Sequence, residues 1–244
     1  MAFKTWRGDV GLIKPTHRPG SLEEFIRLIP EGIGVVPLFL GVTRGTVEEF
    51  TEAIEAYESK VAELAELEVD WIHPEGAPPF MIQGVEGERK IIEGWEDKYG
   101  IPMMTSSQAQ VEAMKALDMH NVVISAYTNR GTNDIVSTYF SEAGFDVLEN
   151  TAIDVPFDQA GHISHMQVYR HTKDAVQRHP ECDGVLLFGS GWRSLEAIEL
   201  LEQDLGIPVA HAVTARVWAV QKVLRIDEPQ SGFGQLLEQM PQGW

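Results

Sequence analysis

The sequence of 244 residues contains very little cysteine, with Cys182 as its one thiol. A single cysteine excludes an intrachain disulfide and any zinc site built from several cysteines. Long hydrophobic runs are missing too: the apolar stretch 35–40 is far too short to span a bilayer. The first residues, MAFKTWRGD, lack the apolar core of a signal peptide. We therefore expect a cytoplasmic protein with no membrane partner.

Positive charge is also scarce. Lysine and arginine number 19 against 37 aspartate and glutamate residues, which gives a net charge of -18. Such a surface does not attract a phosphate backbone, so nucleic acid is not expected as a partner. The acidic residues lie along helical stretches such as 47–67, where they indicate solvated faces. A carboxylate substrate would need local compensation from arginine or backbone N–H groups.

Apolar runs alternate with amphipathic stretches along the whole chain. This alternation predicts an α/β fold with parallel sheets covered by helices on both faces. The expected strands are 10–13, 35–40, 69–72, 103–104, 121–125, 146–150, 185–188 and 209–212. The expected helices are 22–29, 47–67, 90–98, 107–117, 133–143, 168–178, 194–204 and 214–224.

Two segments resemble each other. GIPMMTSSQAQVEAMKAL, 100–117, and GIPVAHAVTARVWAVQKVL, 206–224, share Gly-Ile-Pro and later apolar positions. Two pseudo-symmetric Rossmann-like halves explain this, with residues 1–118 in the first, 119–224 in the second, and a tail, 225–244, that packs back on the first. Ligands gather at the carboxyl ends of parallel strands. We therefore expect the loops 73–80 and 188–193 to face each other across one cleft.

Four stretches then carry a family resemblance: GLIKPTHRPGSLEEFIRLIPEGI, GIPMMTSSQAQVEAMKALDMHNVVISAYT, DGVLLFGSGWRSLEAIELLEQDLGIPV and SGFGQLL. In this order they resemble the aspartate/glutamate racemase superfamily, and within it arylmalonate decarboxylase and maleate cis-trans isomerase. The resemblance implies two α/β domains with the active site between them. It also implies that the site uses no metal or other cofactor.

The resemblance fails at the catalytic thiols. In the superfamily each half supplies one cysteine, and the decarboxylase keeps the second. The alignment places Glu75 at the first position and Gly189 at the second. Cys182 precedes its strand rather than following it, so we interpret it as a packed residue. The chain is therefore expected to work without cysteine.

Glu75 is the candidate acid or base. A carboxyl group enclosed in a cleft can have its pKa raised toward neutral and can then move a proton or activate water. His73 lies two residues before it and would share its face on an extended segment. We expect His73 either to polarise Glu75 or simply to end the strand.

The rest of the expected site binds anions. Tight loops offer the backbone N–H groups of Gly76, Ala77, Gly189, Ser190 and Gly191 to a carboxylate or enolate oxygen. By resemblance, Tyr127 closes the carboxylate pocket and Asn133 is a weaker match to an isomerase asparagine. Arg18 or Arg193 would clamp a second polar group of the substrate. Trp192 and Phe80 are candidates for an apolar wall.

The histidines His162, His165 and His171 leave three interpretations open. His162 or His165 could face the substrate, two of the histidines could bind a metal if a third ligand came from elsewhere, or they are surface residues near a helix N-terminus. The spacing is a much weaker signal than an HExxH motif, so no metal is expected.

Together these features predict a cofactor-independent enzyme for a small anionic or carbonyl substrate. Lyase or isomerase chemistry through a stabilised enolate is the first expectation. A hydrolase of an amide, imide or lactone, with water activated by Glu75, is the second. A non-catalytic binding protein is the third. The sequence leaves the oligomeric state open, a homo-oligomer included.

Overall fold

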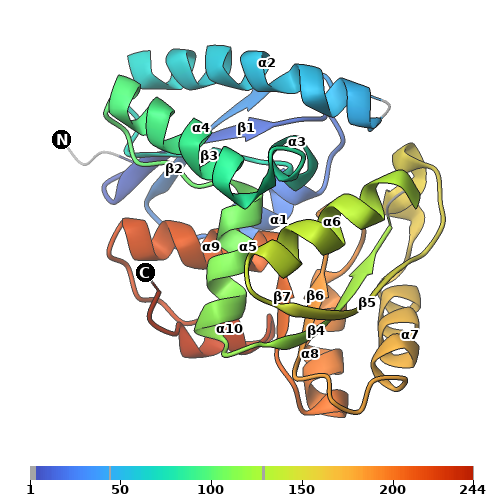
Figure 1. The fold of residues 1–244 in the computed structure, drawn as a ribbon. Coiled ribbons are helices and arrows are strands. Elements are labelled where there is room, and N and C mark those ends of the chain that lie inside the picture. The colour runs from blue at the N-terminus through green and yellow to red at the C-terminus, as the bar shows by residue number, and fades with distance from the viewer. Residues whose placement is uncertain (1–3, 44, 128–129, 244) are drawn as a thin grey trace.

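The computed structural model describes residues 4–43, 45–127 and 130–243 and shows two parallel sheets, each flanked by helices (Figure 1). The first three residues of the N-terminal stretch lie outside this description. No helix of the described residues is long and apolar enough to cross a membrane. The α/β fold predicted from the sequence is confirmed.

The first sheet has the order β2-β1-β3, and all its strands are parallel. Its central strand β1 is apolar on both faces because helices cover both sides, and Val10, Leu12 and Ile13 are fully buried. The elements of this half are β1 (Gly8–Lys14), α1 (Ser21–Leu28), β2 (Ile33–Phe39), α2 (Val47–Glu66), β3 (Trp71–Pro74), α3 (Ala77–Met81), α4 (Gly84–Tyr99) and α5 (Ser106–Ala116).

The second sheet has the order β5-β4-β6-β7 and is also parallel. Its short strand β6 is completely buried. The elements are β4 (Asn121–Ala126), α6 (Arg130–Glu142), β5 (Asp146–Ala152), the 3-10 helix η1 (Phe157–His162), α7 (His165–Val176), β6 (Gly184–Leu187), α8 (Leu195–Leu205), β7 (Val209–His211), α9 (Ala212–Val223) and α10 (Gln235–Gln239).

The repeated Gly-Ile-Pro segments take equivalent places in the two halves. Gly100 and Gly206 end α4 and α8 in the left-handed conformation, with φ of 70° and 72°, which glycine adopts at little cost. After the first repeat, Met103 forms a parallel bridge to Ile72 at the edge of the first sheet. At the equivalent place in the second sheet, β7 pairs with β6. The following helices, α5 and α9, pack against each other in the middle of the molecule (Figure 1).

Some local predictions need correction. Segment 103–104 forms only this isolated bridge, and α4 begins at Gly84, six residues before the predicted start at residue 90. The short elements α3, η1 and α10 were not predicted, because five- and six-residue helices carry little periodicity. In the tail, Gln230 Nε2 donates to the carbonyl of Leu28 in α1, but α10 packs on α9 and β7 of the predicted second half. The domain boundary at residue 118 stays a prediction.

Candidate active site

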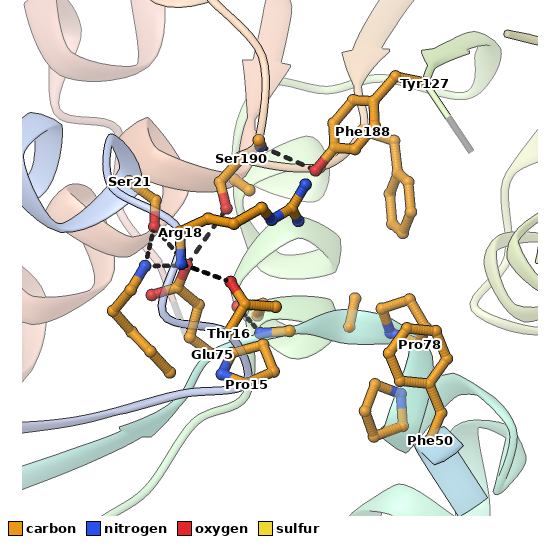
Figure 2. A pocket seen from close by; sticks show the side chains of 18 of the residues that line it. Pro15, Thr16, Arg18, Ser21, Phe50, Glu75, Pro78, Tyr127, Phe188 and Ser190 are labelled. Carbon is orange, nitrogen blue, oxygen red and sulfur yellow. Dashed lines mark hydrogen bonds and ion pairs between the residues drawn. The ribbon is translucent and has the colours of Figure 1, made fainter. Parts of the chain in front are cut away.

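A cavity lies where the carboxyl ends of both sheets meet (Figure 2). Lys14 at the end of β1 lines it together with Thr16 and Arg18 of the following segment, and α1 begins in its wall with Ser21. The segments after β3, β4 and β6 contribute Glu75 to Pro79, Tyr127, and Phe188 to Gly191. Parallel topology explains this convergence, because all strands of a parallel sheet end at the same edge.

Glu75 lies at the centre of a buried ionic cluster. Its Oε2 accepts a hydrogen bond of 2.7 Å from Arg216 Nη1 of α9. Its Oε1 accepts from Ser21 Oγ at 2.7 Å and Ser190 Oγ at 3.2 Å, and Lys14 Nζ lies 3.5 Å away. Lys14 Nζ also donates to Ser21 Oγ. One carboxylate is thus shared by two cations and two hydroxyl groups. Figure 2 shows Glu75 with the two hydroxyl groups, those of Ser21 and Ser190.

This cluster corrects the expected pKa of Glu75. Burial alone would raise the pKa, but the charges of Arg216 and Lys14 and the hydrogen bonds from Ser21 and Arg216 outweigh it. The result is a pKa lowered to about 2 rather than raised toward neutral. Glu75 is therefore ionised at neutral pH, has no proton to donate, and is a weak base for activating water.

His73 does not polarise Glu75. Its side chain is fully buried, and its Nε2 lies 3.1 Å from Ser106 Oγ at the start of α5. Burial, together with the charge of Arg216, lowers the pKa of His73 to about 3, so the ring is neutral. Ser106 Oγ also accepts from the N–H of Gly76 at 3.2 Å. His73 therefore contacts the loop after β3 through Ser106.

Tyr127 and Arg18 lie against the glycine loop after β6. Gly191 N donates to Tyr127 Oη at 2.8 Å, and the Tyr127 ring packs on Trp192 with centroids 5.4 Å apart. A Cβ on Gly191 would lie 2.4 Å from Tyr127 Oη and 3.1 Å from Arg18 Nη1, so glycine is needed for this close approach. Burial raises the pKa of Tyr127, although the neighbouring Arg18 opposes the rise. Tyr127 therefore keeps its proton, and Arg18 reaches across from the first half.

The expected backbone donors divide into two groups. The N–H groups of Gly76 and Gly191 are already bonded to Ser106 and Tyr127. Those of Ala77, Gly189 and Ser190 have no acceptor within the part of the chain that the structure describes. These three N–H groups are free to bind an oxygen of a ligand. His211 supports the second loop from behind, with Nε2 3.2 Å from the carbonyl of Gly189.

Several predicted site residues lie elsewhere. Arg193 is exposed and pairs with Glu196 over 3.2 Å, and His162 is exposed at the end of η1. The carbonyl of Asn133 accepts from Asn150 in the second half, and the residue does not line the cavity. These three residues are near predicted site residues in sequence, but they lie away from the sheet edge where the strands end and the cavity is found.

The predicted apolar wall needs correction, and the open question of the histidine group can be compared with the structure. Within residues 4–43, 45–127 and 130–243, no three histidine, cysteine or acidic side chains are placed to hold a metal, and His171 Nε2 contacts Thr151 Oγ1 at 3.2 Å. Trp192 and Phe80 are core residues. The apolar side of the cavity comes instead from Phe50, Phe188 and several prolines (Figure 2).

Sequence reasoning missed Lys14, Ser21 and Arg216. Two signals were present. Lys14 is a charged residue at the carboxyl end of a buried strand, and Arg216 lies within the apolar helix VTARVWAV, where the internal repeat aligns it with Gln110. Buried charges in such segments indicate paired or functional groups.

Cys182 is not part of the cavity. Its Sγ donates to the carbonyl of Gly184 at 3.2 Å, and its side chain packs in the core of the second half. Burial raises the pKa of this thiol. It therefore has neither the position nor the ionisation of a reactive cysteine.

Comparison with known proteins gives the same fold and names the family. Maleate isomerase of Pseudomonas putida is 25% identical over 203 residues, 78% of each chain, and arylmalonate decarboxylase of Bordetella bronchiseptica is 21% identical over 94% of this chain and 96% of its own. A structure of a variant Nocardia farcinica maleate cis-trans isomerase, with a covalently bound succinylcysteine intermediate, has a TM-score of 0.84 and 23% identity, covering 95% of this chain and 98% of that one. The sequence profile described as arylmalonate decarboxylase matches residues 10–237. The chain belongs to the arylmalonate decarboxylase family.

Proposed function

We propose that this protein is a cofactor-independent enzyme that decarboxylates a small substituted dicarboxylate through an enediolate. The observation that carries the proposal is the charge of the cavity. Lys14 and Arg18 line it, Arg216 lies directly behind Glu75, and Glu75 is the one acidic residue among the described residues of the lining. A chain of net charge -18 thus keeps an excess of positive charge at one enclosed place. Such a place favours an anionic ligand.

In this reaction, different residues of the cavity bind the substrate, stabilise the developing charge and surround the departing group. Arg18 binds one carboxylate of the substrate through its guanidinium. The free N–H groups of Gly189 and Ser190, with the hydroxyl of Tyr127, stabilise the negative charge that develops on the same oxygens. The apolar substituent and the departing carboxylate face Phe50 and Phe188, which form the apolar side of the cavity.

In the reaction the departing carboxylate leaves as carbon dioxide. The electron pair of the broken C–C bond moves into the remaining carboxylate and forms an enediolate. A proton then adds to the carbon and gives the monocarboxylate. The step requires charge stabilisation and one proton source, and it requires no thiol nucleophile.

Decarboxylation is favoured over isomerisation by the position of the thiol. The Nocardia isomerase structure contains a succinylcysteine intermediate, which requires a cysteine that reaches the substrate. In this chain the one cysteine is packed in the core, away from the cavity. The covalent route therefore lacks its nucleophile here. Decarboxylation through an enediolate needs no such nucleophile.

The test is turnover of phenylmalonate and of maleate by the purified protein, followed by carbon dioxide release and by proton NMR. We expect phenylmalonate to be decarboxylated and maleate to be unchanged. Tyr127→Phe should lower kcat/KM by about 10²–10³-fold because one donor to the enediolate is lost. Tyr169→Phe, which removes an exposed hydroxyl bonded to Asp204, is the matched control. No turnover of a panel of substituted malonates, or an unchanged rate in Tyr127→Phe, would contradict the proposal.

A further inference from the structure

The enediolate must receive a proton, and the cavity offers few sources. In the described part of the chain, the titratable residues of the lining are Lys14, Arg18, Glu75 and Tyr127. Arg18 does not release its proton, and Glu75 is ionised by its ion pairs. Burial raises the pKa of Tyr127 and makes it a poorer acid. Lys14 is left.

The geometry around Lys14 distinguishes it from a structural lysine. Its side chain is buried, with 3% exposed; Nζ donates to Ser21 Oγ and forms an ion pair with Glu75 Oε1 over 3.5 Å. An ammonium group has three N–H donors, so one remains for a ligand. Arg216 makes the closer contact with Glu75, at 2.7 Å against 3.5 Å for Lys14. Two cations share one carboxylate, and Lys14 is the one that can lose its proton.

We propose that Lys14 is the general acid that protonates the enediolate carbon in this cavity. The ammonium N–H bond breaks as the new C–H bond forms, and the enediolate electron pair makes that bond. Lys14 becomes a neutral amine and the product a monocarboxylate. Solvent then returns the proton to Lys14. This inference rests on the proposed function, because it supplies that reaction's last step.

The surroundings of Lys14 suit this task. Burial lowers its pKa, the charge of Arg216 lowers it further, and the charges of Glu75 and the more distant Glu23 act in the opposite direction. The net result is a pKa below the ordinary lysine value of 10.5. A general acid is most effective when its pKa approaches the working pH, so a lowered pKa increases the power of Lys14 as a donor.

The first measurement needs no substrate. Protein labelled with ¹³C-lysine is titrated by NMR, and the Lys14 signal is assigned by its absence in Lys14→Arg. The ordinary lysine value of 10.5 is the reference. We expect the Lys14 signal to titrate below this value.

The second measurement uses phenylmalonate and charge-conserving variants. Lys14→Arg keeps the positive charge but cannot transfer a proton, and we expect kcat to fall by about 10²–10⁴-fold. Lys115→Arg is the matched control and should keep the wild-type rate. If thermal unfolding shows that the Lys14→Arg variant does not fold, because arginine is larger, Lys14→Met replaces it in this measurement.

A rebuilt amine separates proton transfer from binding. In a Cys182→Ala background, Lys14→Cys is alkylated with 2-bromoethylamine, which gives a slightly more acidic amine at the same place. For the wild type we expect kcat to fall as pH rises through the pKa of Lys14. The rebuilt amine should restore turnover and move this fall to lower pH, a shift that a purely structural role would not produce.

The outcomes are distinct. Three results together support the inference. The Lys14 signal titrates at lowered pH, folded Lys14→Arg loses kcat, and in the rebuilt amine the fall of kcat with pH occurs at lower pH. Titration of Lys14 at or above the ordinary lysine value of 10.5, or wild-type kcat in Lys14→Arg, overturns it while the proposed function stands. If wild-type protein turns over no substituted malonate, the proposed function fails and the role of Lys14 falls with it, whatever the NMR titration shows.

Discussion

Arg216 Nη1 lies 2.7 Å from Glu75 Oε2, and this buried ion pair joins residues 141 positions apart in the sequence. Arg216 belongs to α9, whereas Glu75 follows β3 of the first sheet. The guanidinium also donates to the carbonyl of Ser21 at 3.0 Å and lies over the ring of Phe25 at 4.5 Å. One side chain therefore connects three segments that form the wall of the cavity.

Removal of this guanidinium should be costly. Arg216→Met leaves the buried Glu75 with Lys14 and two hydroxyl groups as partners, and we expect the free energy of unfolding to fall by about 3–5 kcal/mol. Urea unfolding at pH 7 measures the change. Arg89→Met, which removes an exposed guanidinium on α4, should cost far less, because solvent screens its ion pairs.

The same variant in a Glu75→Gln background tests the pair directly. Without the carboxylate, Arg216→Met should cost at least about 1 kcal/mol less than in the wild type, because the two residues are coupled. Costs that simply add would show that Arg216 acts through packing on Phe25 rather than through Glu75.

The free energy of unfolding should depend on pH through the ionisation of Glu75. Its pKa is lowered from the ordinary 4.5 to about 2, so its contribution is complete above pH 4.5 and is lost as the pH falls toward 2. The shift corresponds to about 3 kcal/mol of unfolding free energy. Urea unfolding of the wild type and Glu75→Gln across this window should show the wild type losing its advantage. Parallel curves for the two proteins would contradict the lowered pKa.

Gly191→Ala should disturb the contact between the glycine loop and Tyr127. The new Cβ would lie 2.4 Å from Tyr127 Oη, and the ring cannot easily retreat because it packs on Trp192. We expect a loss of about 1–3 kcal/mol in the free energy of unfolding, measured in urea. Gly94→Ala on α4 is the control: its Cβ meets nothing within 4 Å, so it should stabilise by about 0.5–1 kcal/mol. Equal effects of the two substitutions would show that the loop tolerates a side chain.

Cys182→Ala should leave kcat/KM for phenylmalonate unchanged, because Sγ contacts the carbonyl of Gly184 and not the cavity. Steady-state kinetics, with and without iodoacetamide, measure this. A rate that depends on the thiol would show that the core around Cys182 opens during turnover.

Much of the fold could be predicted from the sequence. Burial on both faces makes parallel strands continuously apolar, and Gly-Ile-Pro repeats at 100 and 206 mark equivalent helix ends. The loops after β3 and β6 were recognisable from their glycines and from the resemblance. The partners of Glu75 were not, because Ser21, Lys14 and Arg216 are separated from it by 54, 61 and 141 positions.

The sequence by itself determined the alternation of strands and helices, the duplicated halves and the absence of a second thiol. These follow from local periodicity and composition, which each segment carries alone. Only the tertiary structure decided the charge state of Glu75 and the burial of Lys14. The reason is physical: a pKa depends on the sum of burial and of all charges within a few ångströms, and that sum exists only after distant segments have packed together.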